Sequence, residues 1–177
     1  EIIGPDRTLH VQVLAKDAQG MIDDAHRLLD KIDDKIYPKI PTTEAGLLAM
    51  RTLKEEGVKV TATAIYSKTQ GFLAIASGVD YLAPYYNRMQ SIDIDTRGTL
   101  AALAGFIQRF DAPSKIMAAS FKNISQVSHA LESGADAVTL SPKLLRQALS
   151  APDILGAVDD FISDWKSVYG TKTLPED

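Results

Sequence analysis

The sequence lacks cysteine entirely and has no excess of basic residues. Without cysteine it can hold no disulfide, no thiolate nucleophile and no cysteine-ligated zinc or iron–sulfur cluster. Its 177 residues carry 19 lysines and arginines against 23 aspartates and glutamates, so it lacks the basic surface that nucleic-acid binding needs. No apolar run approaches the roughly 20 residues that span a bilayer, and no signal peptide opens the chain. We therefore expect a cytoplasmic globular protein that binds neither nucleic acid nor membrane.

Several common functional motifs are absent as well. The chain contains no glycine-rich loop for a dinucleotide or nucleotide, no serine-hydrolase elbow and no His-Glu-x-x-His zinc motif. His10, His26 and His129 stand far apart, and nothing near them has metal-ligand spacing. The sequence therefore gives no sign of a nucleotide cofactor or a metal site.

Short apolar runs alternate with amphipathic helical patterns along the whole chain, and we count six β/α units in one domain, 1–177. Gly57, Gly78 and Gly134 each end a helical pattern shortly before a strand pattern begins. Such tight turns imply repeated right-handed βαβ crossovers, which build either a doubly wound sheet or a (β/α) barrel. The strands predicted from these patterns are 10–15, 36–40, 58–65, 81–84, 115–120 and 137–140.

Two other segments stand out by their composition. The connection 86–99, after the fourth predicted strand, is long and polar, which is typical of a loop over the functional face of an α/β protein. A C-terminal helix is predicted over 153–169, and its apolar stripe includes Phe161 and Val168. This stripe either packs on the rest of the domain or docks on a neighbouring subunit.

Lys39 stands alone inside the apolar run 36–41, near the carboxyl end of a predicted strand. Burial would disfavour its charged form and lower its pKa, and a free amine there could attack a carbonyl to form a Schiff base. Pro38 and Pro41 instead favour an edge strand or a strand end, where the ammonium would reach into water. These six residues alone leave both interpretations open.

Other polar residues lie at the carboxyl ends of the predicted strands. In a parallel barrel these ends converge on one face, where barrel enzymes keep their chemistry. An amine nucleophile, hydroxyl groups for proton transfer and an arginine for an anion together indicate carbon–carbon bond chemistry on a phosphorylated carbonyl compound. The residues at these ends are Gln12, Lys39, Thr63, Tyr85, Asn87, Arg88 and Ser120.

Five sequence blocks around these residues occur in a recognisable order, at 10–13, 39–47, 61–66, 81–88 and 118–122. In this order they resemble the fructose-6-phosphate aldolase branch of the small transaldolase family, over essentially the whole chain. The resemblance implies an α/β fold of the (β/α)8 TIM-barrel type and class I, Schiff-base aldol chemistry without a metal or an organic cofactor. It also implies a homo-oligomer, a ring-built decamer, in which the C-terminal helix contacts neighbouring subunits.

The resemblance assigns roles to individual residues of the catalytic part. Lys39 matches the lysine that forms the Schiff base. Gln12, Thr63 and Tyr85 match the residues that hold the catalytic water, with Tyr85 as proton donor and acceptor. Gln12 and Tyr85 also favour the aldolase branch, because transaldolases typically have glutamate and phenylalanine at these positions.

The same resemblance assigns a substrate site for a sugar phosphate. Arg88 and Ser120 match the residues that bind the substrate phosphate, and Asn87 lies in the same motif. The reaction implied is the cleavage or formation of fructose 6-phosphate, with dihydroxyacetone and glyceraldehyde 3-phosphate as partners. A transaldolase that transfers a dihydroxyacetone unit, and a non-catalytic sugar-phosphate-binding or assembly subunit, are the two alternatives.

The sequence departs from the family pattern in two ways. Pro38 precedes the lysine where the family usually has a β-branched residue. Family members also begin with two further strands, one carrying an aspartate near the lysine and the next a Thr-[Thr/Ser]-Asn-Pro motif, and these first two strands are absent here. Because six strands cannot close an eight-stranded barrel without a large change in tilt and shear, we expect that an amino-terminal portion is missing from the chain.

Overall fold

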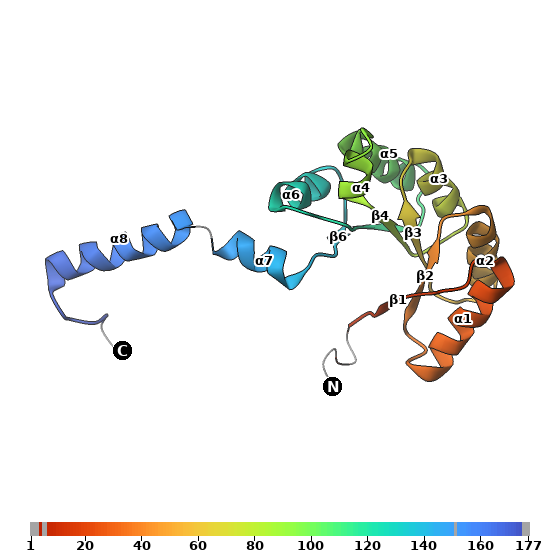
Figure 1. Cartoon of the computed structure of the whole chain (residues 1–177), viewed down its shortest axis with the longest axis horizontal. Coiled ribbons are helices and arrows are strands. Elements are labelled where there is room, and N and C mark those ends of the chain that lie inside the picture. The colour runs from red at the N-terminus through yellow and green to blue at the C-terminus, as the bar shows by residue number, and fades with distance from the viewer. Residues whose placement is uncertain (1–3, 5–6, 151, 175–177) are drawn as a thin grey trace. The chain divides into compact units, whose positions relative to one another are not determined.

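The computed structural model describes residue 4, residues 7–150 and residues 152–174 (Figure 1). Within these residues the chain forms six strands and eight helices, and it divides into two compact units, Glu1–Leu140 and Ser141–Asp177. The strands are β1 (His10–Gln12), β2 (Tyr37–Pro41), β3 (Thr61–Ile65), β4 (Tyr81–Pro84), β5 (Lys115–Ala118) and β6 (Ala137–Val138). The helices are α1 (Ala18–Lys31), α2 (Glu44–Glu55), α3 (Lys68–Ala76), α4 (Tyr86–Gln90), α5 (Thr96–Arg109), α6 (Ile124–Glu132), α7 (Pro142–Leu149) and α8 (Pro152–Tyr169).

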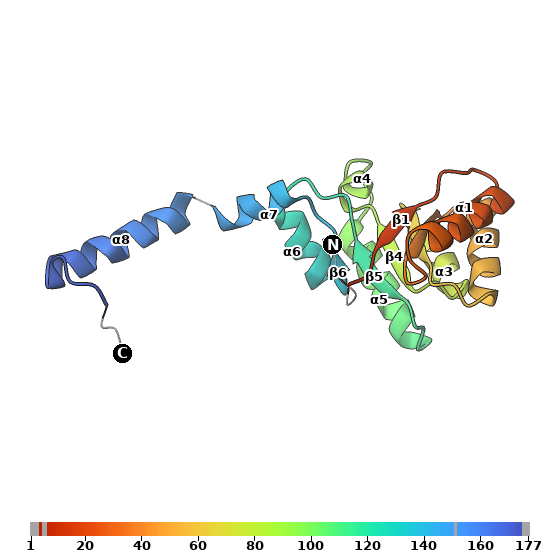
Figure 2. The same cartoon turned by 90° about the horizontal axis from the view of Figure 1, so that it is seen from below.

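The order of the strands in the first unit decides between the two architectures that the crossovers allow. All six strands lie side by side in chain order, and each pairs in parallel with the next. A doubly wound sheet would reverse its order at a switch point, whereas right-handed crossovers in one continuous order place the connecting helices on one side. Figures 1 and 2 show α1, α2, α3 and α5 along one face of the sheet. The first unit is therefore a half-barrel.

Aromatic contacts between distant strands show how strongly this sheet curls. The ring of His10 on β1 stacks on Tyr37 of β2 with centroids 4.6 Å apart, and it meets Tyr81 of β4 edge-on at 5.0 Å. In a flat sheet, where strands lie about 4.8 Å apart, β1 and β4 would be separated by about 14 Å. The three rings can meet only because the face that carries them is concave.

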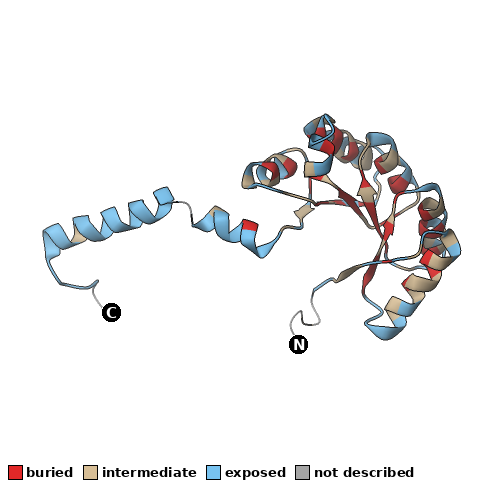
Figure 3. Ribbon diagram, viewed as in Figure 1, coloured by how far each residue is buried: buried red, intermediate tan, exposed pale blue. Residues whose placement is uncertain are grey.

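The apolar core lies between the convex face of the sheet and the helices that cover it. Ile40, Leu82 and Ile116 point from the strands into this core and are fully buried, as are Leu53 of α2 and Leu103 of α5. Figure 3 shows this buried layer along the strands and on the facing sides of the helices. Since side chains alternate along a strand, the neighbours of these core residues, Lys39 among them, belong to the concave face.

Helix ends follow the local chemistry that the sequence predicts. The Asp17 side chain accepts a hydrogen bond from the Gly20 N–H at 2.9 Å and caps α1. Gly57, Gly78 and Gly134 have φ angles of +81°, +76° and +96°, the left-handed conformation that closes a helix. These values confirm the tight helix-to-strand turns.

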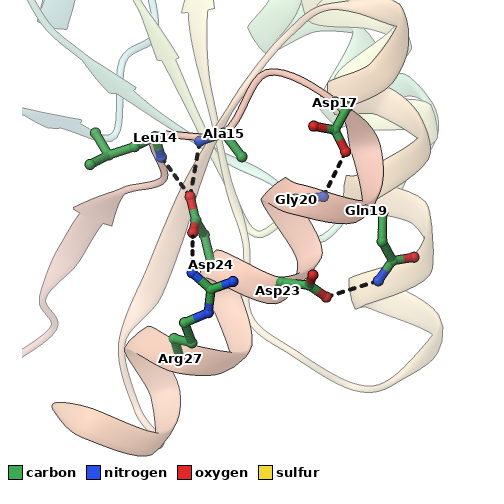
Figure 4. A network of polar contacts seen from close by, with 8 residues as sticks. All are labelled: Leu14, Ala15, Asp17, Gln19, Gly20, Asp23, Asp24 and Arg27. Atoms are coloured by element: carbon green, nitrogen blue, oxygen red, sulfur yellow. Dashed lines mark hydrogen bonds and ion pairs between the residues drawn. The ribbon is translucent and has the colours of Figure 1, made fainter.

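Strand ends are less well predicted, because a side chain can bind the backbone N–H groups that would otherwise continue the strand pairing. The first strand was expected over 10–15 but β1 ends at Gln12. Beyond it, the N–H groups of Leu14 and Ala15 both donate to one carboxylate oxygen of Asp24 at 2.9 Å, and Asp24 also pairs with Arg27 (Figure 4). The two backbone bonds hold the pKa of Asp24 below its ordinary value.

The connection 86–99 was expected to be a loop, and this expectation is wrong. Its first part forms the short helix α4, and α5 already begins at Thr96, where Asp95 accepts the N–H of Gly98 at 2.9 Å. The polar residues that suggested a loop therefore include helix caps.

The second unit contains α7 and α8. Ser141 caps α7 by accepting the Leu144 N–H at 3.2 Å. Helix α8 has no buried residue (Figure 3). Phe161 and Val168 of its apolar stripe are each 70% exposed. No helix among the described residues combines the length and the apolar composition that crossing a membrane requires.

Candidate functional site

Lys39 lies in the second strand of the sheet, half-buried, with β1 on one side and β3 on the other. Its Cα pairs in register with Gln12 and with Thr61. The edge strand that the two prolines suggested is therefore wrong, and the structure gives the reason. Pro38 comes before Lys39, the first residue of β2 that pairs with β3, and Pro41 ends the strand. The N–H groups that the two prolines lack therefore remove few hydrogen bonds from the pairing of β2 with β3.

Gln12 is brought directly to the backbone of Lys39. Its Nε2 donates to the carbonyl oxygen of Lys39 at 2.9 Å and to that of Val13 at 3.1 Å. These bonds fix the Gln12 amide at the carboxyl end of β1, because both N–H groups are engaged.

The surroundings of His10 show on which face of the sheet the Lys39 side chain lies. Its Nδ1 lies 2.8 Å from Oγ1 of the buried Thr61. Burial lowers the pKa of His10, and the positive charge of Lys39 lowers that pKa further. The Lys39 side chain therefore shares this face with the His10 ring.

Thr63, in the middle of β3, and Tyr85, which directly follows β4, form a hydroxyl pair. Thr63 is buried, and its Oγ1 donates to the Tyr85 hydroxyl at 3.2 Å. A register shift between Ala62 and Ile65, with Ala64 at φ +55°, interrupts the ladder at this point. Such bulges redirect side chains at the rims of barrels and beside functional sites.

Arg88 lies over the same tyrosine. Its guanidinium carbon is 5.0 Å from the centre of the Tyr85 ring, and its Nη1 donates to the Tyr66 hydroxyl at 3.0 Å. The hydrogen bond with Tyr66 is the main reason why the pKa of Arg88 is raised above its ordinary value. Arg88 is otherwise exposed, so this rim of the sheet presents a permanent, oriented positive charge.

Asn87 and Ser120 meet through their backbones. The Asn87 N–H donates to the Ser120 carbonyl oxygen at 2.9 Å, and the preceding Tyr86 N–H donates to that of Ala119 at 2.8 Å. Ser120 has a φ of +66°, a conformation that non-glycine residues rarely adopt and that recurs at ligand sites. The start of α4 is thereby tied to the end of β5.

The structure thus brings the seven candidate residues together in three groups. Gln12 contacts Lys39, Thr63 contacts Tyr85 beneath Arg88, and Asn87 contacts Ser120. Among the described residues, no hydrogen bond joins Nζ of Lys39 to any of the other six, and no three metal-ligating side chains gather in one place. An amine, a hydroxyl pair and an oriented cation are the chemical groups that this rim offers.

Tyr66, which holds Arg88, and Gln126, which contacts Asn87, were missed as members of the site. Gln126 donates from Nε2 to the Asn87 side-chain oxygen at 3.0 Å. A local signal was available, because Gln126 stands three residues after the N-cap Asn123. From there a side chain can reach back to the backbone before the helix, here to the Lys122 N–H. Nothing in the sequence shows that the same glutamine also reaches α4, 36 to 39 residues away.

Comparison with known proteins adds an independent line of support. The family model described as transaldolase/fructose-6-phosphate aldolase matches residues 1–171. A curated relative from Streptococcus pneumoniae, named a probable fructose-6-phosphate aldolase, is 47% identical over 174 residues. This alignment covers 98% of the present chain and 78% of the relative.

Proposed function

Because this chain belongs to the transaldolase/fructose-6-phosphate aldolase family, we propose that it is a class I aldolase that cleaves or forms fructose 6-phosphate. Family membership indicates an enzyme of the aldolase or transaldolase type. The single observation that carries the finer proposal is the Thr63–Tyr85 hydroxyl pair at 3.2 Å. It joins β3, the strand that pairs with the Lys39 strand, to the residue that follows β4. An amine nucleophile with hydroxyl groups on the neighbouring strands suits Schiff-base chemistry.

In this proposal Lys39 is the nucleophile. Its Nζ attacks the ketone carbon of fructose 6-phosphate, and loss of water gives a cationic iminium. The 4-hydroxyl group gives up its proton while the C3–C4 bond breaks, and the bonding electrons move into the iminium to form an enamine. Glyceraldehyde 3-phosphate leaves. Protonation of the enamine at C3 and hydrolysis then release dihydroxyacetone and restore the free amine.

A water molecule held by Gln12, Thr63 and Tyr85 would carry the protons between these steps, with the Tyr85 hydroxyl as the immediate donor and acceptor. Two structural features support this role. The Thr63 hydroxyl orients the Tyr85 oxygen, and the Arg88 guanidinium lies over the Tyr85 ring, 5.0 Å from its centre. No metal or organic cofactor takes part in the proposed chemistry.

The phosphate of the substrate would bind at Arg88, Ser120 and Asn87. Arg88 supplies a forked cation that suits phosphate geometry. The backbone bond from Asn87 to Ser120 keeps the two residues adjacent. Dihydroxyacetone carries no phosphate, so this group of residues would act only on the phosphorylated partner.

We extend the proposal to the architecture of the whole protein. The curl and one-sided helices support a (β/α)8 TIM barrel in which β1–β6 are six of the eight strands, since β1 and β6 end the strand order. Residues 1–177 would all belong to this one barrel domain, which they would not complete by themselves. The C-terminal helix, predicted over 153–169, would dock on a neighbouring subunit of a homo-oligomer, a decamer. The proposed location is the cytoplasm.

Transaldolase activity is the second candidate, because the matching family model carries both names. Such an enzyme would retain the same Lys39 chemistry and pass the dihydroxyacetone unit to an aldose. It would form little product from fructose 6-phosphate alone, and erythrose 4-phosphate would stimulate it strongly. Gln12 and Tyr85 favour the aldolase, which would release free dihydroxyacetone without any acceptor.

Replacement of the proposed nucleophile tests the mechanism. Lys39→Met should abolish turnover and leave the fold intact, because methionine has a similar length and no amine. Wild-type protein treated with dihydroxyacetone and borohydride should gain one covalent adduct on Lys39, measured by intact-mass spectrometry and peptide mapping. Lys68→Met, a change at the exposed start of α3, is the matched control and should keep both activity and adduct.

Two results would contradict the proposal. An adduct on a different lysine would show that this other lysine, and not Lys39, is the nucleophile. Absence of any adduct in the wild type, with sugar-phosphate binding retained, would favour a non-catalytic binding subunit.

A further inference from the structure

Gln126 connects the two segments that carry the proposed phosphate ligands. It lies in the first turn of α6 and is only 6% exposed. Its Oε1 accepts the Lys122 N–H at 2.8 Å, on the loop that follows Ser120. Its Nε2 donates to the side-chain oxygens of Asn87 at 3.0 Å and of Gln90 at 2.7 Å, both on α4. One buried amide therefore joins the β5–α6 loop to α4.

The hydrogen-bond chemistry fixes the orientation of each amide in this chain of contacts. A backbone N–H can only donate, so the Gln126 atom facing Lys122 must be the oxygen. Both hydrogens of Gln126 Nε2 then point at α4, and the Asn87 atom that meets them must be an acceptor. Asn87 is thereby held with its carbonyl oxygen toward Gln126 and its Nδ2 hydrogens turned away.

This orientation matters because Asn87 stands between the two other proposed phosphate ligands. Its N–H bonds to the carbonyl oxygen of Ser120, and Arg88 follows it on α4. An Asn87 side chain that presents N–H groups can donate to an anion, whereas a flipped side chain would present an oxygen and repel it.

We propose that Gln126 is a positioning residue for phosphate recognition, which fixes the Asn87 amide as a donor and holds α4 beside Ser120. The inference rests on the proposed function, because it takes Arg88, Ser120 and Asn87 as the phosphate site. It adds the residue that makes this site selective for an anion without itself touching the substrate.

Gln126→Glu is the decisive variant. It preserves the size of the side chain and the acceptor for the Lys122 N–H but removes both donors. The Asn87 amide should then turn its Nδ2 toward the new carboxylate. Gln126→Met, which is neutral and also lacks the donors, separates the loss of donation from the added charge.

The readout compares two acceptor aldehydes in the synthesis direction, with dihydroxyacetone as the donor. The ratio of kcat/KM for glyceraldehyde 3-phosphate to that for unphosphorylated glyceraldehyde should fall about tenfold or more in both variants, through KM, because a bond to a charged group is lost. The borohydride adduct with dihydroxyacetone should not change. Titration with inorganic phosphate, followed in spectra of the side-chain amides, should show a similar loss of affinity.

Gln19→Glu provides the control. Gln19 is exposed in the first turn of α1, and its Nε2 donates to a carboxylate oxygen of Asp23 at 2.9 Å, a contact outside the candidate site. The same chemical change there also removes a side-chain donor, but it should not alter the preference for the phosphorylated aldehyde.

The outcomes separate this inference from the proposed function. Equal losses with both aldehydes, or unchanged phosphate affinity in Gln126→Glu, would overturn the positioning role while the adduct on Lys39 still supports the aldolase. A wild type that forms no adduct would overturn the aldolase, and the phosphate titration would then decide the role of Gln126 alone. A wild type that forms the adduct but shows neither phosphate affinity nor a preference for the phosphorylated aldehyde would overturn the phosphate site, and with it the role of Gln126.

Discussion

At the scale of single residues, the concave face places Lys39 near His10, and the positive charge of Lys39 disfavours protonation of His10. His10 is held by Thr61 and by the rings of Tyr37 and Tyr81. Its neutral form is favoured first by burial and then by the charge of Lys39. An imidazole that stays neutral adds no further positive charge beside the cationic iminium proposed on Lys39.

The coupling between these two residues can be measured directly. Lys39→Met removes the nearby positive charge, so the pKa of His10 should rise, while burial should still keep it below the ordinary value of 6.5. The check is a titration of the His10 ring signals by NMR, with Lys68→Met as the control that leaves the pKa unchanged. An unaltered pKa in Lys39→Met would mean that the ammonium points away from His10.

Residues of the site differ in how far the sequence predicts them. Lys39 and the hydroxyl residues Thr63 and Tyr85 can be proposed from their places at strand ends and from the family resemblance. The partners that orient them could not be predicted. Tyr66 reaches Arg88 across 22 residues and Gln126 reaches Asn87 across 39, and such pairings depend on how the loops pack.

At the scale of elements, one glycine controls how closely a helix approaches the strand that carries Lys39. A Cβ atom at Gly46, in the first turn of α2, would lie 1.8 Å from the carbonyl oxygen of Pro41, which ends β2. The obstacle is backbone, which cannot move without shifting the strand end. Gly46 is therefore required by close packing.

Paired alanine substitutions should show opposite effects on stability. Gly46→Ala should lower the free energy of unfolding by about 2 kcal/mol or more, because overpacking against backbone forces local distortion. Gly105→Ala, in the exposed part of α5 with no atom within 4 Å of the new Cβ, should raise it by about 0.5 to 1 kcal/mol. Urea denaturation measures both. A neutral Gly46→Ala would show that α2 can move away from β2 at little cost.

Local chemistry explains which element boundaries the sequence predicts. The Asp17 cap and the left-handed glycines depend on neighbouring residues only, and both are confirmed. The end of β1 depends on Asp24, ten and nine residues from the N–H groups that it binds. Helix α4 was missed because its five residues carry too little periodicity to reveal it.

At the scale of the whole molecule, the crossovers in the sequence allow two architectures, and the strand order selects one. Every pairing joins consecutive strands, which removes the switch point of a doubly wound sheet. The family resemblance predicts the barrel type, and the half-barrel agrees with it.

The exposed stripe of α8 leads to a prediction about association. If this helix docks on a neighbouring subunit as proposed, Phe161→Asp should weaken association about tenfold or more, since it removes a large apolar side chain from the contact. Sedimentation velocity over a range of concentrations measures the effect. Asp160→Asn, on the same helix but outside the stripe, should associate normally. Identical sedimentation of Phe161→Asp and the wild type would exclude this contact.

The sequential strand order also bears on how the protein forms during translation. Gln12 and Lys39 are 27 residues apart, and Thr63 and Tyr85 are 22 apart, so each contact closes a short loop at modest entropic cost. Because chains emerge amino-terminus first, both contacts can form before Ser120 has emerged from the ribosome. The proposed amine and proton-transfer groups would thus be assembled first, and the phosphate site would be the last part of the catalytic rim to be completed on the ribosome.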